Sequence, residues 1–200
     1  MEEPPNLSTR DRILWTAMTM IGEDASTSLS VRAVAARAGV SSGSLRYHFP
    51  TQRALQDAVL TGLYDVLTPD GRIHETHTPA RDRLVDCLRQ VLEPAGVGEQ
   101  SRKGWLRIVE NFMASEPTRE VRDTYFAYDR EGQRRVSYWL TVLIDEGALA
   151  PGDNDRRARF LNTVINGLSI QRALPAEESI LRTETETLYM AVDFVLGSRE

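Results

Sequence analysis

Basic and hydroxyl side chains that could bind phosphate gather in one stretch of the chain, between Ser28 and Arg53. This stretch contains four arginines and no Asp or Glu, so its formal charge is +4 in a chain whose total is −5. Guanidinium and hydroxyl groups are common donors to phosphate oxygens. The residues outside the stretch sum to −9, so the acidic total hides a local basic region that favours contact with a polyanion.

Two short helices must position these side chains, because residues 30–49 have the pattern of a helix-turn-helix. Ser30 is a good N-cap for the first helix, and Gly39 can adopt the positive φ that the tight turn requires. Ala35 is small enough for the helices to cross closely, and Leu45 would fill the crevice between them. A basic, hydroxyl-rich face on a helix-turn-helix predicts a surface that docks on DNA.

Helical periodicity also dominates the rest of the 200 residues, and strand-like alternation is nearly absent. We expect an all-α fold of about nine helices in two unequal parts. The predicted helices start at Ser8, after Ser30, at Ser41 or Ser42 and at Thr51, and then cover about 79–93, 102–115, 118–146, 153–173 and 177–196. The expected organisation is a three-helix helix-turn-helix domain over 1–50, a connecting helix over 51–68, a linker over 69–79 and a C-terminal helical domain over 80–200.

Several other classes of protein do not fit this sequence. No apolar run approaches the ~20 residues that span a bilayer, and the N-terminus lacks the apolar region of a signal peptide. Cys87 is the only cysteine, which excludes an intramolecular disulfide and indicates a cytoplasmic protein. His74 and His77 lack a convincing third ligand, so we expect no metal and no cofactor. Without a nucleophile elbow, a phosphate loop or paired carboxylates, we expect no catalytic residue and no enzyme.

Residues 8–60 carry a distinctive set of small, apolar and aromatic positions. The set consists of Ile13, Leu14, Ala17, Val34, Ala35, Ala38, Gly39, Val40, Ser41, Gly43, Ser44, Leu45, Tyr47, His48, Phe49, Pro50, Thr51 and Leu55. In these residues the chain resembles the DNA-binding region of the TetR family of transcriptional repressors, and the run from Leu45 to Gln52 is similar to a betaine-regulator-like subgroup. Two positions depart from the family pattern: Arg46 stands where many members have Tyr, and Gln52 stands where a Lys commonly contacts a phosphate.

The resemblance implies that residues 41–48 form a recognition helix, which enters the major groove of a palindromic operator in double-stranded DNA. The expected DNA contacts are Ser30, Arg32, Ser41, Ser42, Ser44, Arg46, Tyr47, His48, Thr51, Gln52 and Arg53. Ser42, Ser44 and Arg46 would face base edges, and Arg46 would read a guanine because Arg is the usual bidentate partner of O6 and N7. Tyr47 and His48 have an alternative role, which is packing against the first helix.

The resemblance also implies that the part after the linker binds a small-molecule effector. Aromatic residues with polar neighbours between 105 and 139 suit a ligand pocket, and neighbouring acids would favour a cationic organic effector through cation–π attraction. The predicted effector contacts are Trp105, Asn111, Phe112, Tyr125, Phe126, Tyr128 and Trp139. The alternative is that these rings belong to the hydrophobic core.

A homodimer is the third implication, because one helix-turn-helix reads only a half-site and paired half-sites lie ~34–36 Å apart. The last two predicted helices carry apolar stripes that suit a two-fold four-helix bundle. The expected dimer interface consists of Phe160, Leu161, Val164, Ile165, Leu168, Leu188, Val192 and Val195. The alternative is again that these residues form the core of a single chain.

The sequence therefore predicts a dimeric repressor that a small-molecule effector releases from its operator. The alternative is a helix-turn-helix regulator without such an effector, which is constitutive or controlled by a protein partner. An enclosed cavity in the C-terminal part would favour the first hypothesis, and a filled core would favour the second.

Overall fold

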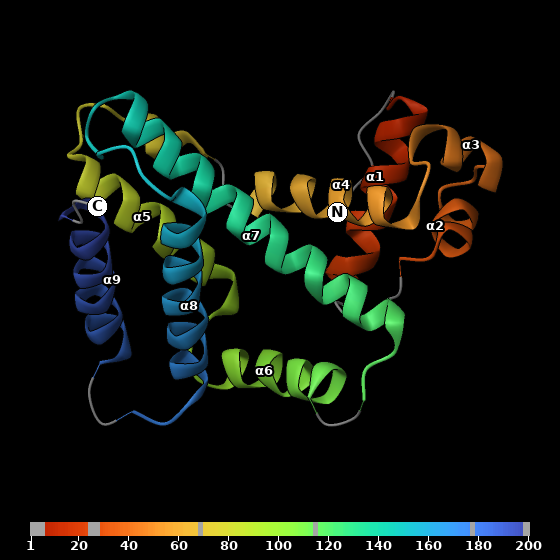
Figure 1. Cartoon of the computed structure of the whole chain (residues 1–200). Helices are drawn as coiled ribbons and strands as arrows, with labels where there is room; N and C mark the ends of the chain where they lie inside the picture. Colours follow the sequence, from red (N-terminus) through yellow and green to blue (C-terminus); the bar gives the residue numbers. More distant parts are fainter. Residues whose placement is uncertain (1–6, 24–28, 68–69, 114–115, 177–178, 198–200) are drawn as a thin grey trace. The chain divides into compact units, whose positions relative to one another are not determined.

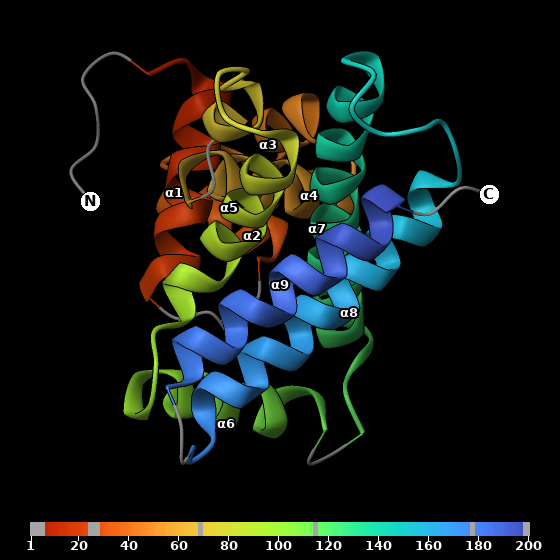
Figure 2. The same cartoon turned by 90° about the vertical axis from the view of Figure 1, so that its left-hand side faces the viewer.

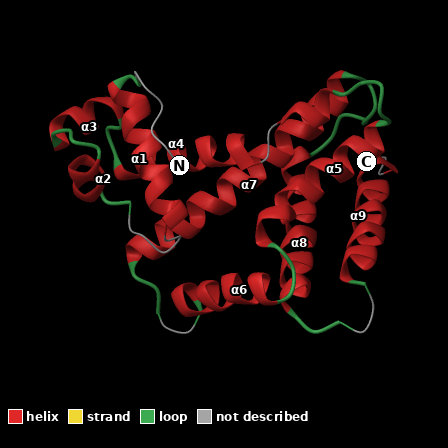
Figure 3. Ribbon diagram, turned by 180° about the vertical axis from the view of Figure 1, so that it is seen from behind, coloured by secondary structure: helices red, strands yellow, loops and turns green. Residues whose placement is uncertain are grey.

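The computed structural model describes residues 7–23, 29–67, 70–113, 116–176 and 179–197. Across these ranges the chain forms nine α-helices and two short 3-10 helices, with no strand (Figure 3). In chain order (Figure 1) they are α1 (Thr9–Glu23), α2 (Val31–Arg37), α3 (Ser42–His48), α4 (Gln52–Leu67), η1 (Asp70–His74), α5 (Ala80–Leu92), η2 (Glu93–Ala95), α6 (Glu99–Phe112), α7 (Arg119–Asp145), α8 (Asn154–Ala173) and α9 (Ile180–Gly197). The predicted all-α fold is confirmed. None of the described helices combines the length and apolar character that crossing a bilayer requires.

The helices belong to two compact units. The N-terminal unit comprises Met1–Val66 and Val109–Glu131, and the C-terminal unit comprises Leu67–Ile108 and Gly132–Glu200. Helices α6 and α7 therefore each contribute residues to both units. Residues 109–131, which lie within the predicted C-terminal domain over 80–200, cluster with the helix-turn-helix.

The core of the N-terminal unit lies among α1, α2, α3 and α4, the first three of which are grouped together in Figure 1. Ile13, Val34, Leu45 and Leu55 are completely buried there. Ala127 of α7 is 1% exposed and belongs to the same core, which explains why this turn of α7 joins the N-terminal unit. Burying a side chain the size of Val or Leu contributes about 1.5–3 kcal/mol, so the shared core holds these helices in a defined arrangement.

The C-terminal unit is built around α5, α8, α9 and the second half of α7. Helix α5 packs against α8 and α9, and α8 and α9 lie side by side (Figure 2). Leu84, Trp139, Leu161 and Leu188 are completely buried in its core. Cys87 is buried in the same core, and burial raises the pKa of its thiol to about 12. The thiol is therefore protonated and shielded at neutral pH.

Buried arginines join the helices of the C-terminal unit. Arg172 of α8 donates to both carboxylate oxygens of Glu184, at 2.5 and 2.8 Å, and to the backbone oxygen of Leu92. Arg83 of α5 donates to both carboxylate oxygens of Glu146. A planar guanidinium satisfies several acceptors at once in a fixed geometry, which an ammonium group does less well. These buried arginines account for part of the excess of Arg in a chain that has a single lysine.

The predicted linker over 69–79 contains a short packed helix. Its start forms η1, in which Ile73 is completely buried. Asp70 accepts hydrogen bonds from Arg135 at 2.7 Å and from the indole N–H of Trp139 at 2.8 Å. One apolar residue in a polar stretch gives no periodicity, so the sequence pattern could not reveal that this turn is packed.

Candidate nucleic-acid interface

The turn between α2 and α3 has the geometry that the sequence predicted. Gly39 has a φ of +64°, in the left-handed region that favours glycine. The amide of Val40 donates to the carbonyl oxygen of Ala35 at 3.0 Å, which closes the end of α2. Leu45 is completely buried and Ala35 is 2% exposed, so the two helices cross at a small residue and enclose a large one.

Three hydroxyl groups predicted to contact phosphates are helix caps. Ser30 accepts a hydrogen bond from the amide of Ala33 at 3.2 Å, and Ser41 accepts one from the amide of Ser44 at 3.0 Å. Thr51 caps α4 in the same way, through the amide of Ala54 at 3.0 Å. Capping uses the hydroxyl oxygen as an acceptor and leaves its O–H as a donor, so the same group can also bind a phosphate oxygen.

The four arginines of the basic stretch fall into two classes. Arg37 donates to Glu23 at 2.5 Å, and this hydrogen bond lowers the pKa of Glu23. Arg53 lies 3.6 Å from a carboxylate oxygen of Asp57 on its own helix. Arg32 and Arg46 are exposed and form no ion pair or hydrogen bond with the described part of the chain. The net charge of +4 therefore overstates the basic surface, because Arg37 is held by Glu23 and Arg53 lies near Asp57, while Arg32 and Arg46 have no such partner among the described residues.

Helix α3 carries the predicted base-reading residues. Arg46 is exposed, and Ser42 and Ser44 are half-buried on the same short helix. The ring of Tyr47 is 83% exposed, so packing against α1 is excluded as its role. His48 is half-buried, with its ring centroid 5.1 Å from that of Tyr47, and both of its predicted roles stay open.

Gly43 is a residue of this face whose role the sequence did not single out. Its φ is not positive, and a Cβ added there would meet only the hydroxyl oxygen of Ser41, at 3.7 Å. Neither backbone strain nor packing within the described chain requires glycine at this position. A missing side chain in the first turn of α3 leaves the backbone open to close approach by a partner molecule.

Three of the predicted effector contacts lie together in the N-terminal unit. The ring centroids of Phe112 and Tyr125 are 5.5 Å apart, and those of Tyr125 and Phe126 are 5.9 Å apart. Tyr125 and Phe126 are 48% and 51% exposed, so these rings are not simply core. Tyr128 is partly buried against the core of the same unit. The side chain of Asn111 lies outside the described residues.

The two predicted tryptophan contacts belong to the C-terminal unit. Trp139 is completely buried and donates its indole N–H to Asp70, which is the arrangement that the core alternative expects. Trp105 is half-buried, and its indole N–H donates to the hydroxyl of Ser169 at 3.1 Å, which ties α6 to α8. Aromatic residues at helical spacing look alike in sequence, whether they face a core or a ligand.

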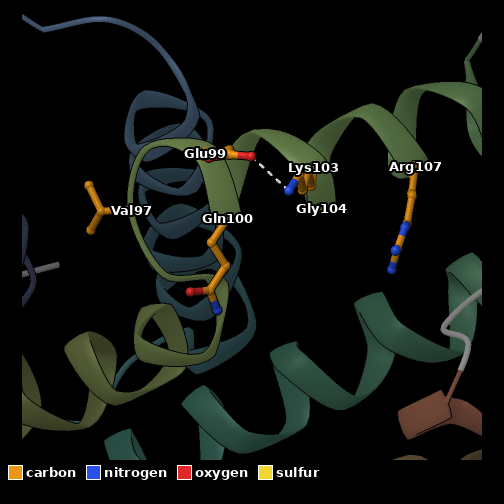
Figure 4. Close-up of a pocket in the computed structure, with 6 residues that line it drawn as sticks. All are labelled: Val97, Glu99, Gln100, Lys103, Gly104 and Arg107. Carbon is orange, nitrogen blue, oxygen red and sulfur yellow. Dashed lines mark ion pairs between the residues drawn. The ribbon is translucent and has the colours of Figure 1, made fainter.

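A surface depression of about 570 Å³ lies along α6 in the C-terminal unit (Figure 4). Its lining consists of Val97, Glu99, Gln100, Lys103, Gly104 and Arg107. Lys103 is paired with Glu99 at 2.7 Å, as the dashed line shows. None of the predicted effector residues lines this depression, and it is open to the surface, unlike the enclosed cavity that would favour the effector hypothesis.

The predicted dimer interface is largely the core of the chain itself. Six of its eight residues are at most 5% exposed, namely Leu161, Ile165, Leu168, Leu188, Val192 and Val195. These six side chains face the chain's own interior, as the core alternative expects, while Val164 is half-buried. The large apolar residues that α8 and α9 do expose include Phe160, Met190 and Phe194, at 39%, 73% and 65%. The rings of Phe160 and Phe194 lie 5.3 Å apart between centroids.

Two protein-family models match the chain. One is described as bacterial regulatory proteins of the tetR family and matches residues 13–59, and the other is described as the C-terminal part of BetI-type transcriptional repressors and matches residues 80–189. The second match alone spans more than half of the chain. A search of the curated proteins found no match.

Two of the three solved structures compared below are described with the same family name. One, described as a TetR-family transcriptional regulator from Rhodococcus sp., is 26% identical with a TM-score of 0.54, over 94% of this chain and 98% of that chain. The transcriptional repressor QsdR of R. erythropolis, from the TetR family, is 15% identical with a TM-score of 0.54, over 96% of each chain. GusR of Salmonella enterica is 19% identical with a TM-score of 0.52, over 98% of each chain. At these identities the last two show the fold alone.

Proposed function

Because the chain belongs to the TetR family of bacterial regulatory proteins and has a C-terminal part of the BetI type, we propose that it is a dimeric repressor that a small molecule releases from its operator. The observation that carries the DNA-binding part is Arg46, an exposed residue of α3 that has no ion-pair or hydrogen-bond partner among the described residues. A free guanidinium on the second helix of a helix-turn-helix can form a bidentate contact with guanine.

The other polar groups divide by their surroundings. Ser42 and Ser44 lie on α3 with Arg46 and are proposed to face base edges. Ser30 and Thr51, which cap α2 and α4, are proposed to donate to phosphates, as are Arg32, Ser41, Tyr47, His48, Gln52 and Arg53. Contacts to phosphates orient the protein, whereas contacts to bases select the sequence.

Selection of genomic DNA fragments by the purified protein tests the proposal. We expect recovery of a palindromic site with two half-sites about one helical turn apart, ~34–36 Å, that binds more tightly than random DNA. Recovery of fragments without a shared sequence would refute sequence-specific regulation.

The exposed apolar face of α8 and α9, which includes Phe160, Met190 and Phe194, is the proposed dimer surface. It lies on the solvent side of the same two helices whose other stripes fill the core. Exposed aromatic and methionine side chains are enriched in protein interfaces, and two copies of this face would form a four-helix bundle. Sedimentation analysis that found only monomers at micromolar concentration would refute this part of the proposal.

The aromatic cluster of Phe112, Tyr125 and Phe126 supports an organic effector, and we propose a cationic one. Faces of aromatic rings attract cations, by about 0.5–2 kcal/mol for each favourable contact. A thermal-shift screen with quaternary ammonium compounds and neutral compounds of the same shape tests this, followed by release of bound DNA. Stabilisation by the neutral compounds alone would exclude a cationic effector, and a chain that no compound releases from DNA would support constitutive or partner-controlled regulation instead.

A further inference from the structure

Asp57 of α4 lies between two arginines of the N-terminal unit. One carboxylate oxygen is 2.7 Å from a guanidinium nitrogen of Arg130 on α7, and the other is 3.6 Å from Nε of Arg53, four residues earlier on α4. Arg53 stands two residues after Thr51, and both are proposed phosphate contacts. The carboxylate is therefore shared between a residue of the proposed DNA surface and a residue of another helix.

The two arginines hold Asp57 unequally. A separation of 2.7 Å is a charge-assisted hydrogen bond, whereas 3.6 Å is beyond hydrogen-bonding distance. The side chain of Arg53 is also the more exposed, at 69% against 39% for Arg130. Arg130 thus neutralises the carboxylate, and Arg53 remains extended into solvent at the start of α4.

The turn of α7 that carries Arg130 connects two regions of the N-terminal unit. Glu131 accepts a hydrogen bond from Thr61 of α4 at 3.1 Å, so this turn is joined to α4 at two successive residues. Arg130 also follows Phe126 by four residues, which places both on the same side of the helix. A shift of α7 at the proposed effector residue Phe126 would therefore also move the partner of Asp57.

We propose that Arg130 is a positioning residue for DNA binding, which acts by holding the carboxylate of Asp57 in its own hydrogen bond, so that Arg53 forms none with it. When Arg130 moves away or is replaced, the carboxylate of Asp57 pairs with Arg53 instead. Each half-site then loses one phosphate contact. The inference rests on the proposed DNA binding and adds to it a residue that touches no DNA. Through this exchange of partners by Asp57, a movement of α7 would change the affinity for DNA.

The test measures the salt dependence of DNA binding for five variants and the wild type. They are Arg130→Gln, Asp57→Asn, the double variant of these two, Arg130→Lys, and Arg119→Gln as the control. Arg119 lies on the same helix, is 91% exposed and faces Asp123 at 3.9 Å, so its replacement makes the same charge change away from α4. Fluorescence anisotropy titrations on the selected operator and on random DNA, at about 50 to 200 mM salt, give the affinity at each salt concentration. They also give the slope of log K against log salt.

We expect Arg130→Gln to bind operator and random DNA more weakly, on the order of 10-fold per half-site near 0.1 M salt. The slope of log K against log salt should fall by about 0.9 per protomer, the value for one phosphate contact. Asp57→Asn and the double variant should bind at least as tightly as the wild type, because the competing carboxylate is gone. Arg119→Gln should keep the wild-type slope. Arg130→Lys, which keeps the positive charge, should recover most of the DNA affinity that Arg130→Gln loses.

Two results would overturn the inference while leaving the proposed function intact. The first is a wild-type slope for Arg130→Gln. The second is a double variant that binds as weakly as Arg130→Gln, because the loss would then come from disturbed packing and not from the freed carboxylate. A wild-type chain that binds no DNA at all would instead refute the proposed function, and the inference with it.

Discussion

Replacing Gly43 with alanine should stabilise the folded chain and at the same time weaken its binding to DNA. The new Cβ would lie 3.7 Å from the hydroxyl oxygen of Ser41, an ordinary van der Waals contact, and the backbone there is not left-handed. Glycine inside a helix costs about 0.5–1 kcal/mol relative to alanine, so the variant should gain up to that amount. For a chain of this size the melting temperature should rise by about 1–4 °C.

The loss on DNA has a different origin. In the proposed complex with DNA, the methyl group of alanine would stand between the backbone of α3 and the phosphate to which we expect a backbone amide to donate. A hydrogen bond to a charged group contributes about 1.5–3 kcal/mol, so losing one per half-site should raise the Kd more than about tenfold. The two effects of Gly43→Ala have opposite signs, which a merely structural role of the glycine cannot produce.

Gly39→Ala provides the matched control from the neighbouring turn. A Cβ at Gly39 meets nothing within 4 Å, but its φ of +64° makes alanine unfavourable by about 1–2 kcal/mol. Thermal unfolding followed by circular dichroism should thus shift in opposite directions for the two variants, and fluorescence anisotropy on operator DNA measures the binding. A Gly43→Ala chain that melts lower than the wild type, or that binds DNA with wild-type affinity, would refute the reasoning.

Three further predictions concern the C-terminal unit. Glu184→Ala should lower the free energy of unfolding by about 3–5 kcal/mol in a urea titration, because it leaves the buried charge of Arg172 without its partner. Glu146→Gln should cost about 1 kcal/mol at pH 7. The hydrogen bond from Arg83 lowers the pKa of Glu146 below its ordinary 4.5, so wild-type stabilisation is full above that pH and lost as the pH falls through the lowered value. Urea titrations should therefore show a smaller difference in unfolding free energy between the wild type and Glu146→Gln at pH 3 than at pH 7. An equal difference at the two pH values would contradict the direction of this pKa shift. Phe194→Glu should convert dimers to monomers in sedimentation analysis, because it places a charge in an apolar face; an unchanged dimer would move the interface elsewhere.

The helix-turn-helix was predictable because its requirements are local. A positive φ at Gly39, a small residue at Ala35 and serine caps are set by backbone geometry within a few residues, and all are present in the structure. The other helices followed from periodicity and from Pro and Gly between them. The free guanidinium of Arg46 also agrees with the prediction, although its contact with a base is untested.

The features that the sequence could not predict depend on contacts between residues that lie far apart along the chain. The ion pair of Arg37 with Glu23 spans 14 positions, and that of Asp57 with Arg130 spans 73, so neither appears in a count of charge over a window. On α8, Phe160 and Leu161 are adjacent apolar residues, yet one is exposed and the other completely buried. Periodicity identifies an apolar stripe but does not say whether a partner or the chain's own core covers it.

The central claim, that α3 reads a DNA sequence, is tested most directly by Arg46→Ala on two DNA molecules. Fluorescence anisotropy titrations would compare the variant with the wild type on the selected operator and on random DNA of equal length. The account predicts a loss of roughly 1–3 kcal/mol on the operator and little change on random DNA. An equal loss on both would make Arg46 a phosphate contact, and no loss on either would contradict the claim that this arginine reads the operator.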